Sequence, residues 1–334
     1  MPELRQNPFT KQWVIIATER AKRPHDFVRK NDNPVTIPSY VANCPFCPGN
    51  EHLTPGESHS VHRNGKWQVR VVPNKFSALS SEGELSRMVD GLKRTVNGVG
   101  IHEVVVETPD HSQTTALLSE QDIEMIVRSY KDRYFAITDD TRVEHVTIFK
   151  NHGTSAGTSL EHPHSQIIAT PIIPPDIRTR MEVALRFYDE HGKCIFCKVL
   201  MDELAEQVRI VHETQHFVCL VPFASLTPFS LWIFPRRHMA SFGEIQPEEM
   251  LDLARMLRIV LAKIYNGLAN PDFNYVVRTA PGENRYSRYY HWYVSVIPRL
   301  TKVAGFELGS GMFINPTIPE TNARFLREVD VSNL

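Results

Sequence analysis

The chain has 334 residues, and its 37 lysine and arginine residues nearly balance 38 aspartate and glutamate residues. This balance provides no overall field that favours nucleic acid or a membrane surface, and no apolar run approaches the length of a membrane span. Residues 1–8 lack the apolar core of a signal peptide, so the sequence predicts a cytoplasmic protein with no nucleic-acid or membrane partner. The length is sufficient for two domains.

Four of the five cysteines form two Cys-x-x-Cys pairs, which begin at residues 44 and 194. In a reducing compartment such pairs favour a metal over a disulfide. Each pair is followed by two distant histidines, and two thiolates with two imidazoles suit tetrahedral Zn²⁺. Because protein atoms would fill all four positions, the sequence predicts two structural zinc sites. Their ligands are Cys44, Cys47, His111 and His162 in the first half, and Cys194, Cys197, His238 and His291 in the second.

Two other interpretations of these cysteines are weaker. A redox Cys-x-x-Cys requires a βαβ context, which the sequence does not indicate, and it leaves the histidines without a role. A zinc finger that binds nucleic acid conflicts with the near-zero net charge, and the spacing of a recognition helix is absent. The fifth cysteine, Cys219, has no partner at a suitable spacing and is predicted to lie in the core.

The predicted elements follow one order in both halves. In the first half, apolar strands end at Pro73 and Val106, and a helix begins at Ser119, with Asp122 in its first turn. In the second half, strands end near positions 222 and 234, and a helix begins with Pro247. Each helix leads to two further strands, the second of which carries a histidine. These strands cover residues 143–150 and 162–170, and residues 274–279 and 291–297.

This repetition predicts a tandem duplication. Short antiparallel strands with one long helix per unit favour an α+β fold over a doubly wound parallel sheet. We expect an N-terminal catalytic half, residues 1–180, and a C-terminal half, residues 181–334, with a degenerate active site. The reason is that Tyr293, two residues after His291, stands where the first half has His164, two residues after His162.

The segment His162-Pro163-His164 carries the strongest chemical signal. Histidines two residues apart in a strand point to the same side, and the proline between them stiffens the pair. Upstream, the small residues of segment 151–159 can bring backbone amides and hydroxyls close to phosphate oxygens. An imidazole beside such a loop indicates nucleophilic attack on phosphorus, and a metal on His162 would orient His164 without touching the substrate.

The chain resembles galactose-1-phosphate uridylyltransferases and their close relatives, a branch of the histidine-triad (HIT) superfamily. The resemblance implies tandem HIT-like units that form an open, mostly antiparallel half-barrel sheet with helices packed on it, and a homodimer. It also implies ping-pong transfer of a nucleoside monophosphate through a covalent nucleotidyl-histidine. The matching segments include Arg20-Ala-Lys-Arg23-Pro24, Cys44-Pro-Phe-Cys47, Val72-Pro-Asn-Lys75, Thr108-Pro-Asp-His111, Phe149-Lys-Asn151, His162-Pro-His164-Ser-Gln166 and Gly305-Phe306-Glu307.

The resemblance implies roles for individual residues. His164 would attack the α-phosphorus while the His162 carbonyl fixes its tautomer, and Gln166 and Ser159 would hold phosphate oxygens. Gln166 stands where hydrolases of the superfamily have a third histidine. Because an amide cannot transfer a proton, Gln166 favours transfer between phosphates over hydrolysis. Further contacts to the nucleotide or sugar phosphate are implied for Arg20, Arg23, Asn74, Asn151, Gly153, Lys302, Phe306 and Glu307.

Three functions remain open. The first is uridylyl exchange between UDP-glucose and galactose 1-phosphate, in galactose metabolism. The second is adenylyl transfer by the same histidine, with phosphate attacking ADP-glucose or adenylylsulfate. Some uridylyltransferases carry a His-x-His pair at the positions of Ser295 and Ile297 and an aspartate at that of Lys75, so the base and the acceptor stay open. The third is a zinc-stabilised nucleotide-binding protein without turnover, which the intact histidine motif disfavours.

Overall fold

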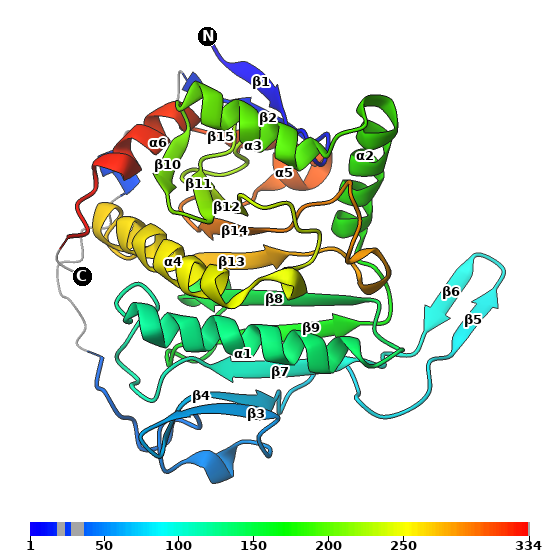
Figure 1. The fold of residues 1–334 in the computed structure, drawn as a ribbon, viewed down its shortest axis with the longest axis vertical. Coiled ribbons are helices and arrows are strands. Elements are labelled where there is room, and N and C mark those ends of the chain that lie inside the picture. Colours follow the sequence, from blue (N-terminus) through cyan, green and yellow to red (C-terminus); the bar gives the residue numbers. More distant parts are fainter. Residues whose placement is uncertain (19–23, 28–36, 333–334) are drawn as a thin grey trace.

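The centre of the fold is an open sheet of ten strands in the part of the chain that the computed structural model describes, residues 1–18, 24–27 and 37–332. The strands are β3 (His59–Arg63), β4 (Lys66–Pro73), β7 (Ile101–Val106), β8 (His145–His152), β9 (His164–Thr170), β10 (Ile210–Glu213), β11 (Phe217–Leu220), β12 (Leu231–Pro235), β13 (Phe273–Arg278) and β14 (Tyr293–Pro298). Their order across the sheet is β10-β11-β12-β14-β13-β8-β9-β7-β4-β3 (Figure 1). Every neighbouring pair is antiparallel.

Counted inward from each edge of the sheet, the strands of the two halves follow one another in the same pattern along the chain. β3, β4, β7, β9 and β8 form one half of the sheet, β10, β11, β12, β14 and β13 form the other, and the halves meet where β8 pairs with β13. The registers agree as well, since Gln166 lies opposite Val104 and Ser295 lies opposite Trp232. The predicted α+β fold of tandem units on an open, mostly antiparallel sheet is therefore confirmed. The division at residue 180 stays a prediction.

Two long amphipathic helices cover one face of the sheet. They are α1 (Glu120–Thr138) and α4 (Pro247–Gly267), which pack against each other at the front of Figure 1. Both begin as predicted, because the Ser119 hydroxyl accepts a hydrogen bond from the Asp122 amide at 3.2 Å and Pro247 occupies the first helical position. Their aliphatic faces and alternate residues of the strands, such as Ile148 and Val294, form the main core.

The other face of the second half is covered by elements that the repeat did not predict. α2 (Pro175–His191) and α3 (Ile195–Glu206) pack there with Phe9 from the N-terminal segment. A small sheet of β1 (Glu3–Gln6), β2 (Trp13–Ile16) and β15 (Phe313–Asn315) lies beyond them, next to α5 (Gly305–Ser310). Near the C-terminus, α6 (Pro319–Glu328) packs on β10 and α4.

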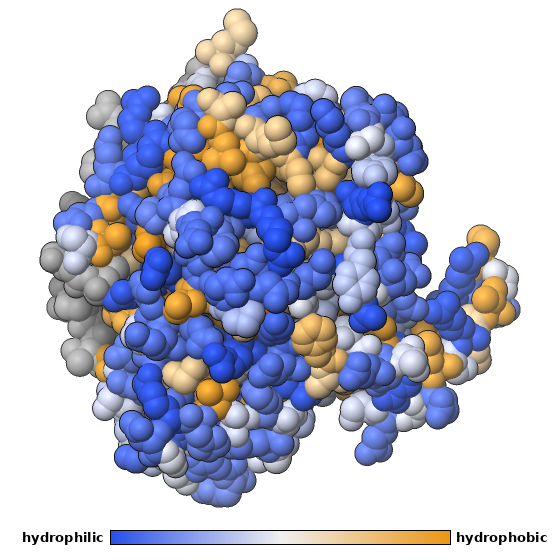
Figure 2. Space-filling view, viewed as in Figure 1, coloured by the Kyte–Doolittle hydropathy of each residue, from blue (hydrophilic) through white to orange (hydrophobic). Residues whose placement is uncertain are grey.

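A hairpin of β5 (Arg87–Asp90) and β6 (Lys93–Val96) projects from the body of the molecule (Figure 1), and Figure 2 shows apolar side chains at its end. These include Met88, Val89 and Leu92, which are exposed.

The edge strands β3 and β10 were not predicted from the sequence, because they are short and carry polar residues on both faces. Within the described residues, no helix combines the length and the apolar composition that crossing a membrane demands.

Candidate active site and metal centres

His164 opens strand β9 and lies on the sheet face opposite α1 and α4. Its Nδ1 lies 2.9 Å from the carbonyl oxygen of His162, so the Nδ1–H donates to this carbonyl and the Nε2 lone pair is left free. The side chain is buried, and burial lowers the pKa of His164 below its ordinary value. At neutral pH the imidazole is therefore uncharged, which a nucleophile requires.

A cavity of about 550 Å³ opens in front of His164. Four predicted site residues line it: His164 and Gln166 from β9, Ser159 from the preceding loop and Asn74 from the turn after β4. Apolar side chains form much of the remaining wall, namely Pro45, Phe46, Leu53, Pro55 and Phe76. An apolar cavity with a few convergent polar groups is the usual form of a small-molecule site.

His102 on β7 is a site residue that the sequence reasoning missed. Its Nδ1 accepts a hydrogen bond from the Ala78 amide at 3.1 Å, so the proton of the neutral ring lies on Nε2. That Nε2–H donates to the Gln166 Oε1 at 2.8 Å. The Asn74 Nδ2 also lies 3.0 Å from the His102 Nε2, but both of these nitrogens are donors, so this contact is not a hydrogen bond. The Gln166 oxygen is thus occupied, and its NH₂ group remains to donate to a ligand. Alternation with Val104 and Val106 along β7 was the available signal.

A buried polar network lies directly behind His164, on the helix-facing side of the sheet. Lys150 on β8 donates to Glu107 at 2.6 Å and to the backbone carbonyl of His164 at 3.2 Å. The Tyr130 hydroxyl from α1 donates to the Ser165 hydroxyl at 2.6 Å. Burial alone would raise the pKa of Glu107, but the Lys150 charge and several hydrogen bonds lower it. The carboxylate therefore stays ionised, and the network ties the start of β9 to β8 and α1.

Two predicted residues of the small-residue loop lie away from the cavity wall. Among the described residues that line the His164 cavity, neither Asn151 nor Gly153 appears. Asn151 accepts a hydrogen bond from the Asn274 amide at 2.8 Å, which joins the two halves of the sheet. Gly153 has a φ of +82°, and a Cβ there would lie 2.0 Å from the Asp272 carboxylate, so only glycine fits. Their predicted role toward phosphate stays a prediction.

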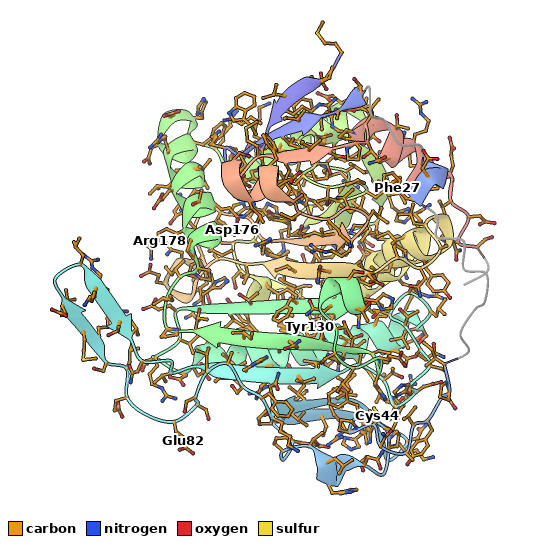
Figure 3. The ribbon with its side chains drawn as sticks, turned by 180° about the vertical axis from the view of Figure 1, so that it is seen from behind. Phe27, Cys44, Glu82, Tyr130, Asp176 and Arg178 are labelled. Atoms are coloured by element: carbon orange, nitrogen blue, oxygen red, sulfur yellow. The ribbon has the colours of Figure 1, made fainter. Side chains whose placement is uncertain are left out.

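The segment predicted to contact the sugar phosphate lies in the other half of the chain. Lys302, Phe306 and Glu307 lie in or just before α5, beside β15, and Phe306 is 46% exposed. None of the three is among the described residues around the His164 cavity of the same chain. Figures 1 and 3 place α5 beyond β13 and β14, on the far side of the seam from β9. Arg20 and Arg23 lie outside the described residues.

The first predicted metal group is assembled in the fold. The sulfur and nitrogen atoms of Cys44, Cys47, His111 and His162 all lie within 4.8 Å of one another, and all four side chains are buried. The Cys47 Sγ lies 3.4 Å from the His111 Nδ1, which lies 3.2 Å from the His162 Nδ1. Zinc bond lengths and tetrahedral angles require ligand separations of about 3.3–3.8 Å, so the residues fit a tetrahedral ion. The His162 Nε2 lies 2.7 Å from the Thr108 carbonyl, which directs the Nδ1 lone pair inward.

The second predicted group is assembled in the same way. Cys194, Cys197, His238 and His291 place their ligand atoms within 4.8 Å of one another. The Cys197 Sγ lies 3.2 Å from the His238 Nδ1 and 3.3 Å from the His291 Nδ1. This group is less buried than the first, since His238 is exposed and Cys197 is partly exposed. The fold therefore brings together both predicted sets of four, and each could hold a metal ion.

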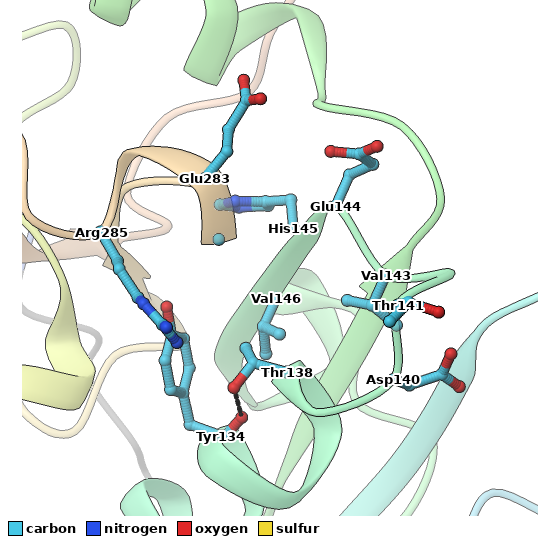
Figure 4. A pocket seen from close by; sticks show the side chains of 11 residues that line it. Tyr134, Thr138, Asp140, Thr141, Val143, Glu144, His145, Val146, Glu283 and Arg285 are labelled. Atoms are coloured by element: carbon cyan, nitrogen blue, oxygen red, sulfur yellow. Dashed lines mark hydrogen bonds between the residues drawn. The ribbon is translucent and has the colours of Figure 1, made fainter.

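A smaller cavity of about 200 Å³ lies at the end of β8 and β9 remote from His164 (Figure 4). It is lined by Glu144, His145 and Glu283 among others, and burial lowers the pKa of His145 to about 4. The Thr138 hydroxyl donates to the Tyr134 carbonyl at its edge. The described residues form no third group of metal-ligand atoms, at this cavity or elsewhere. This cavity is separate from the His164 site.

Comparison with known proteins decides the family. Residues 1–174 match the family described as galactose-1-phosphate uridyl transferase, N-terminal domain, and residues 181–333 match its C-terminal domain. The chain belongs to the galactose-1-phosphate uridylyltransferase family. The recognition made from the sequence is thereby confirmed, and the protein is an enzyme of the nucleotidyltransferase class.

Relatives with two different names align with nearly the whole chain. ADP-glucose phosphorylase from Arabidopsis thaliana is 37% identical over 99% of this chain and 94% of its own length. Galactose-1-phosphate uridylyltransferase from Thermotoga maritima is 33% identical over 99% of both chains. The crystal structure of an Arabidopsis thaliana ADP-glucose phosphorylase with bound ADP-glucose matches with a TM-score of 0.84, at 33% identity over 99% of this chain and 100% of the other. A solved uridylyltransferase structure matches with a TM-score of 0.75 at 27% identity, over 98% and 97% of the two chains.

Proposed function

We propose that the protein transfers a nucleoside monophosphate between two phosphate groups through a covalent intermediate on His164. The observation that carries this proposal is the buried, neutral His164 ring at the cavity, whose Nδ1–H is committed to the His162 carbonyl. Attack of Nε2 on the α-phosphorus forms a nitrogen–phosphorus bond and breaks the bond to the leaving phosphate oxygen. Attack by a second phosphate then breaks the nitrogen–phosphorus bond and restores the free imidazole.

We assign Gln166 to the charge on the transferred phosphoryl group. With its oxygen held by the His102 Nε2–H at 2.8 Å, its NH₂ group can donate to a phosphoryl oxygen in the transition state. Ser159 lines the same cavity and would add a hydroxyl donor. Neither side chain can deliver a proton to a leaving group. An acceptor and a leaving group that are already anions, such as phosphates, require no such proton.

Two donor and acceptor pairs are supported by named relatives. UDP-glucose with galactose 1-phosphate is supported by the Thermotoga maritima uridylyltransferase at 33% identity. ADP-glucose with inorganic phosphate is supported by the Arabidopsis thaliana phosphorylase at 37% identity. The deciding test is the intact mass of the protein after incubation with each nucleotide sugar, quenched at high pH. A uridylyl adduct supports the first pair and an adenylyl adduct the second, and the same incubation of His164→Ala is the control. No adduct with either nucleotide sugar, nor with adenylylsulfate in a third incubation, would overturn the covalent mechanism.

We propose that both Cys₂His₂ groups hold zinc in a structural role. The first ion would be held by Cys44, Cys47, His111 and His162, and it would fix the peptide segment that carries His164. Metal analysis of the purified protein tests this directly. Two equivalents of zinc per chain are expected, and iron in the second group would correct the assignment of that group alone.

We also propose a homodimer, because Lys302, Phe306 and Glu307 lie away from the His164 cavity of their own chain. In a two-fold dimer, α5 of one copy can reach the cavity of the other. The test mixes His164→Ala chains with Glu307→Ala chains after dissociation and reassociation. Half of the dimers are then mixed and each mixed dimer has one complete site, so about a quarter of wild-type activity should return. If the reassociated mixture is no more active than the two variants measured separately, α5 does not contribute to the partner's site.

A further inference from the structure

The second half of the chain has a cavity at the place that corresponds to the His164 cavity. Ser295 on β14 lies opposite Trp232 on β12, as Gln166 lies opposite Val104 in the first half. Tyr293, two residues before Ser295, therefore corresponds to His164. Tyr293, Ser295 and Trp232 all line a cavity of about 220 Å³. The duplication has thus left a cavity on the same sheet face in both halves.

Three arginines give this cavity a positive wall. Arg180, Arg278 and Arg299 line it, and the described residues around it include no aspartate or glutamate. Arg180 is 7% exposed, and it donates to the Tyr293 hydroxyl at 2.7 Å and to Asp176 at 3.0 Å. Arg278 donates to the same carboxylate at 2.6 Å. Figure 3 labels Asp176 on this face of the sheet, in the half away from Cys44.

The charges at this cavity do not cancel. One carboxylate, Asp176, faces two guanidinium groups, and it is itself 46% exposed. The third guanidinium, that of Arg299, is exposed and makes no side-chain hydrogen bond or ion pair with any residue that the structure describes. Arg278 also keeps a buried Nε without a hydrogen-bond partner in the described chain. Excess cationic donors in a concave site select an anion, and planar guanidinium groups favour phosphate.

The rest of the wall indicates what the anion is attached to. Hydroxyls are supplied by Ser225, Thr227, Ser230, Ser295 and Thr301. Trp232, Tyr293 and Phe313 are the aromatic residues of the wall, and of these Phe313 is partly exposed, so that a sugar ring can lie against it. The cavity has less than half the volume of the His164 cavity, about 220 against about 550 Å³, so its ligand is smaller than a nucleotide sugar.

We propose that this cavity of the second half is a separate binding site for a small sugar phosphate. Tyr293 replaces the nucleophilic histidine, and its hydroxyl is engaged by Arg180, so the site binds without forming a covalent intermediate. The proposal depends on the arginines and the duplicated sheet, and it stands whether or not His164 carries a nucleotide.

Equilibrium dialysis with radiolabelled glucose 1-phosphate tests the proposal on the full-length chain. Wild-type protein should bind one more equivalent per chain than Arg299→Ala, a variant of an exposed side chain that leaves the fold intact. Arg94→Ala, in the exposed strand β6, is the matched control and should bind as wild type does. A parallel series with inorganic phosphate shows whether the phosphate group alone is sufficient.

A second variant, Ser295→Phe, fills the cavity and should lose the same equivalent. Its melting temperature and circular dichroism report whether it folds, and Arg299→Ala carries the test if it does not. Equal stoichiometry in wild type and Arg299→Ala, for both glucose 1-phosphate and inorganic phosphate, overturns the proposal. A missing His164 adduct in the mass experiment leaves this result unaffected, so the two proposals fail separately.

Discussion

The Nζ of Lys150 lies 2.6 Å from the Oε2 of Glu107, and the two side chains are 2% and 0% exposed. The same ammonium donates to the carbonyl of His164 at 3.2 Å. An ion pair this deeply buried is stable only while both partners are present, because each charge has lost its hydration. The residue proposed to attack phosphorus is thus hydrogen-bonded through its backbone to a group that cannot easily be removed.

Replacing Lys150 by methionine should strongly destabilise the fold. The substitution leaves Glu107 buried without a counter-charge, which costs about 3–5 kcal/mol in the free energy of unfolding. Urea denaturation measures this loss. The double variant Lys150→Met/Glu107→Leu should recover most of it. Lys198→Met, which breaks an exposed pair with Asp202, should change stability by less than about 1 kcal/mol. Equal losses for Lys150→Met and Lys198→Met would contradict the role of burial.

The Glu107 carboxylate predicts a pH-dependent difference between two proteins. Lys150 and hydrogen bonds lower the pKa of this carboxylate in the fold, despite its burial. The ionised carboxylate therefore stabilises the fold at a pH above its ordinary pKa of about 4.3, and this contribution is lost as the pH falls through the pKa of the folded state. The difference in unfolding free energy between wild type and Glu107→Gln should therefore be larger at pH 7 than at pH 4. If the difference in unfolding free energy were instead larger at pH 4 than at pH 7, the pKa of Glu107 would be raised in the fold and not lowered.

His164→Ala should abolish the nucleotide adduct and lower turnover by a factor of more than about 10⁴, as expected for a covalent nucleophile. Tyr293→Phe removes the corresponding residue of the second half and should leave turnover within about twofold of wild type. Rates with saturating nucleotide sugar and intact masses provide the two readouts. Full activity in His164→Ala together with loss in Tyr293→Phe would exchange the roles of the two halves.

Gln166→His should increase hydrolysis of the intermediate relative to transfer. The histidine introduces a group that can activate water, whereas the native amide can only donate hydrogen bonds. The measurement is the partition of a preformed His164 adduct between water and a phosphate acceptor. Gln166→Asn is the control, since it keeps an amide and should slow both routes together. An unchanged partition ratio in Gln166→His would refute the role assigned to Gln166.

Cys44→Ser should release the first metal ion and reduce both stability and turnover. A structural ion contributes directly to folding, and here it would hold His162, two residues before the proposed nucleophile. Metal content, melting temperature and rate are the measurements. Cys219→Ser changes a buried cysteine outside both metal groups and should leave the metal content at its wild-type value. Retention of the ion and of full activity in Cys44→Ser would dismiss a structural role for that site.

Residue types at recurring spacings were sufficient to predict much of this protein. The two Cys-x-x-Cys pairs with their histidines, the helix starts at Ser119 and Pro247, and the repeated strand order could all be found in the chain, since each depends on local chemistry or on a pattern that occurs twice. The same reasoning singled out His164 as the candidate nucleophile, because a histidine two residues after a predicted metal ligand forms a short and specific motif. The α+β fold followed from short strands with one long helix in each repeated unit.

Only the tertiary structure decided which distant residues meet. His102 contacts Gln166 diagonally between the neighbouring strands β7 and β9, and Lys150 on β8 reaches Glu107 across β9, just past the end of β7. Both contacts depend on the strand registers, which no local pattern specifies. The structure also placed α5 away from the His164 cavity and three arginines around Tyr293 in the second half. Spacing along the chain reports the chemistry that a residue can perform, whereas the packing of strands and helices determines the partners with which it performs it.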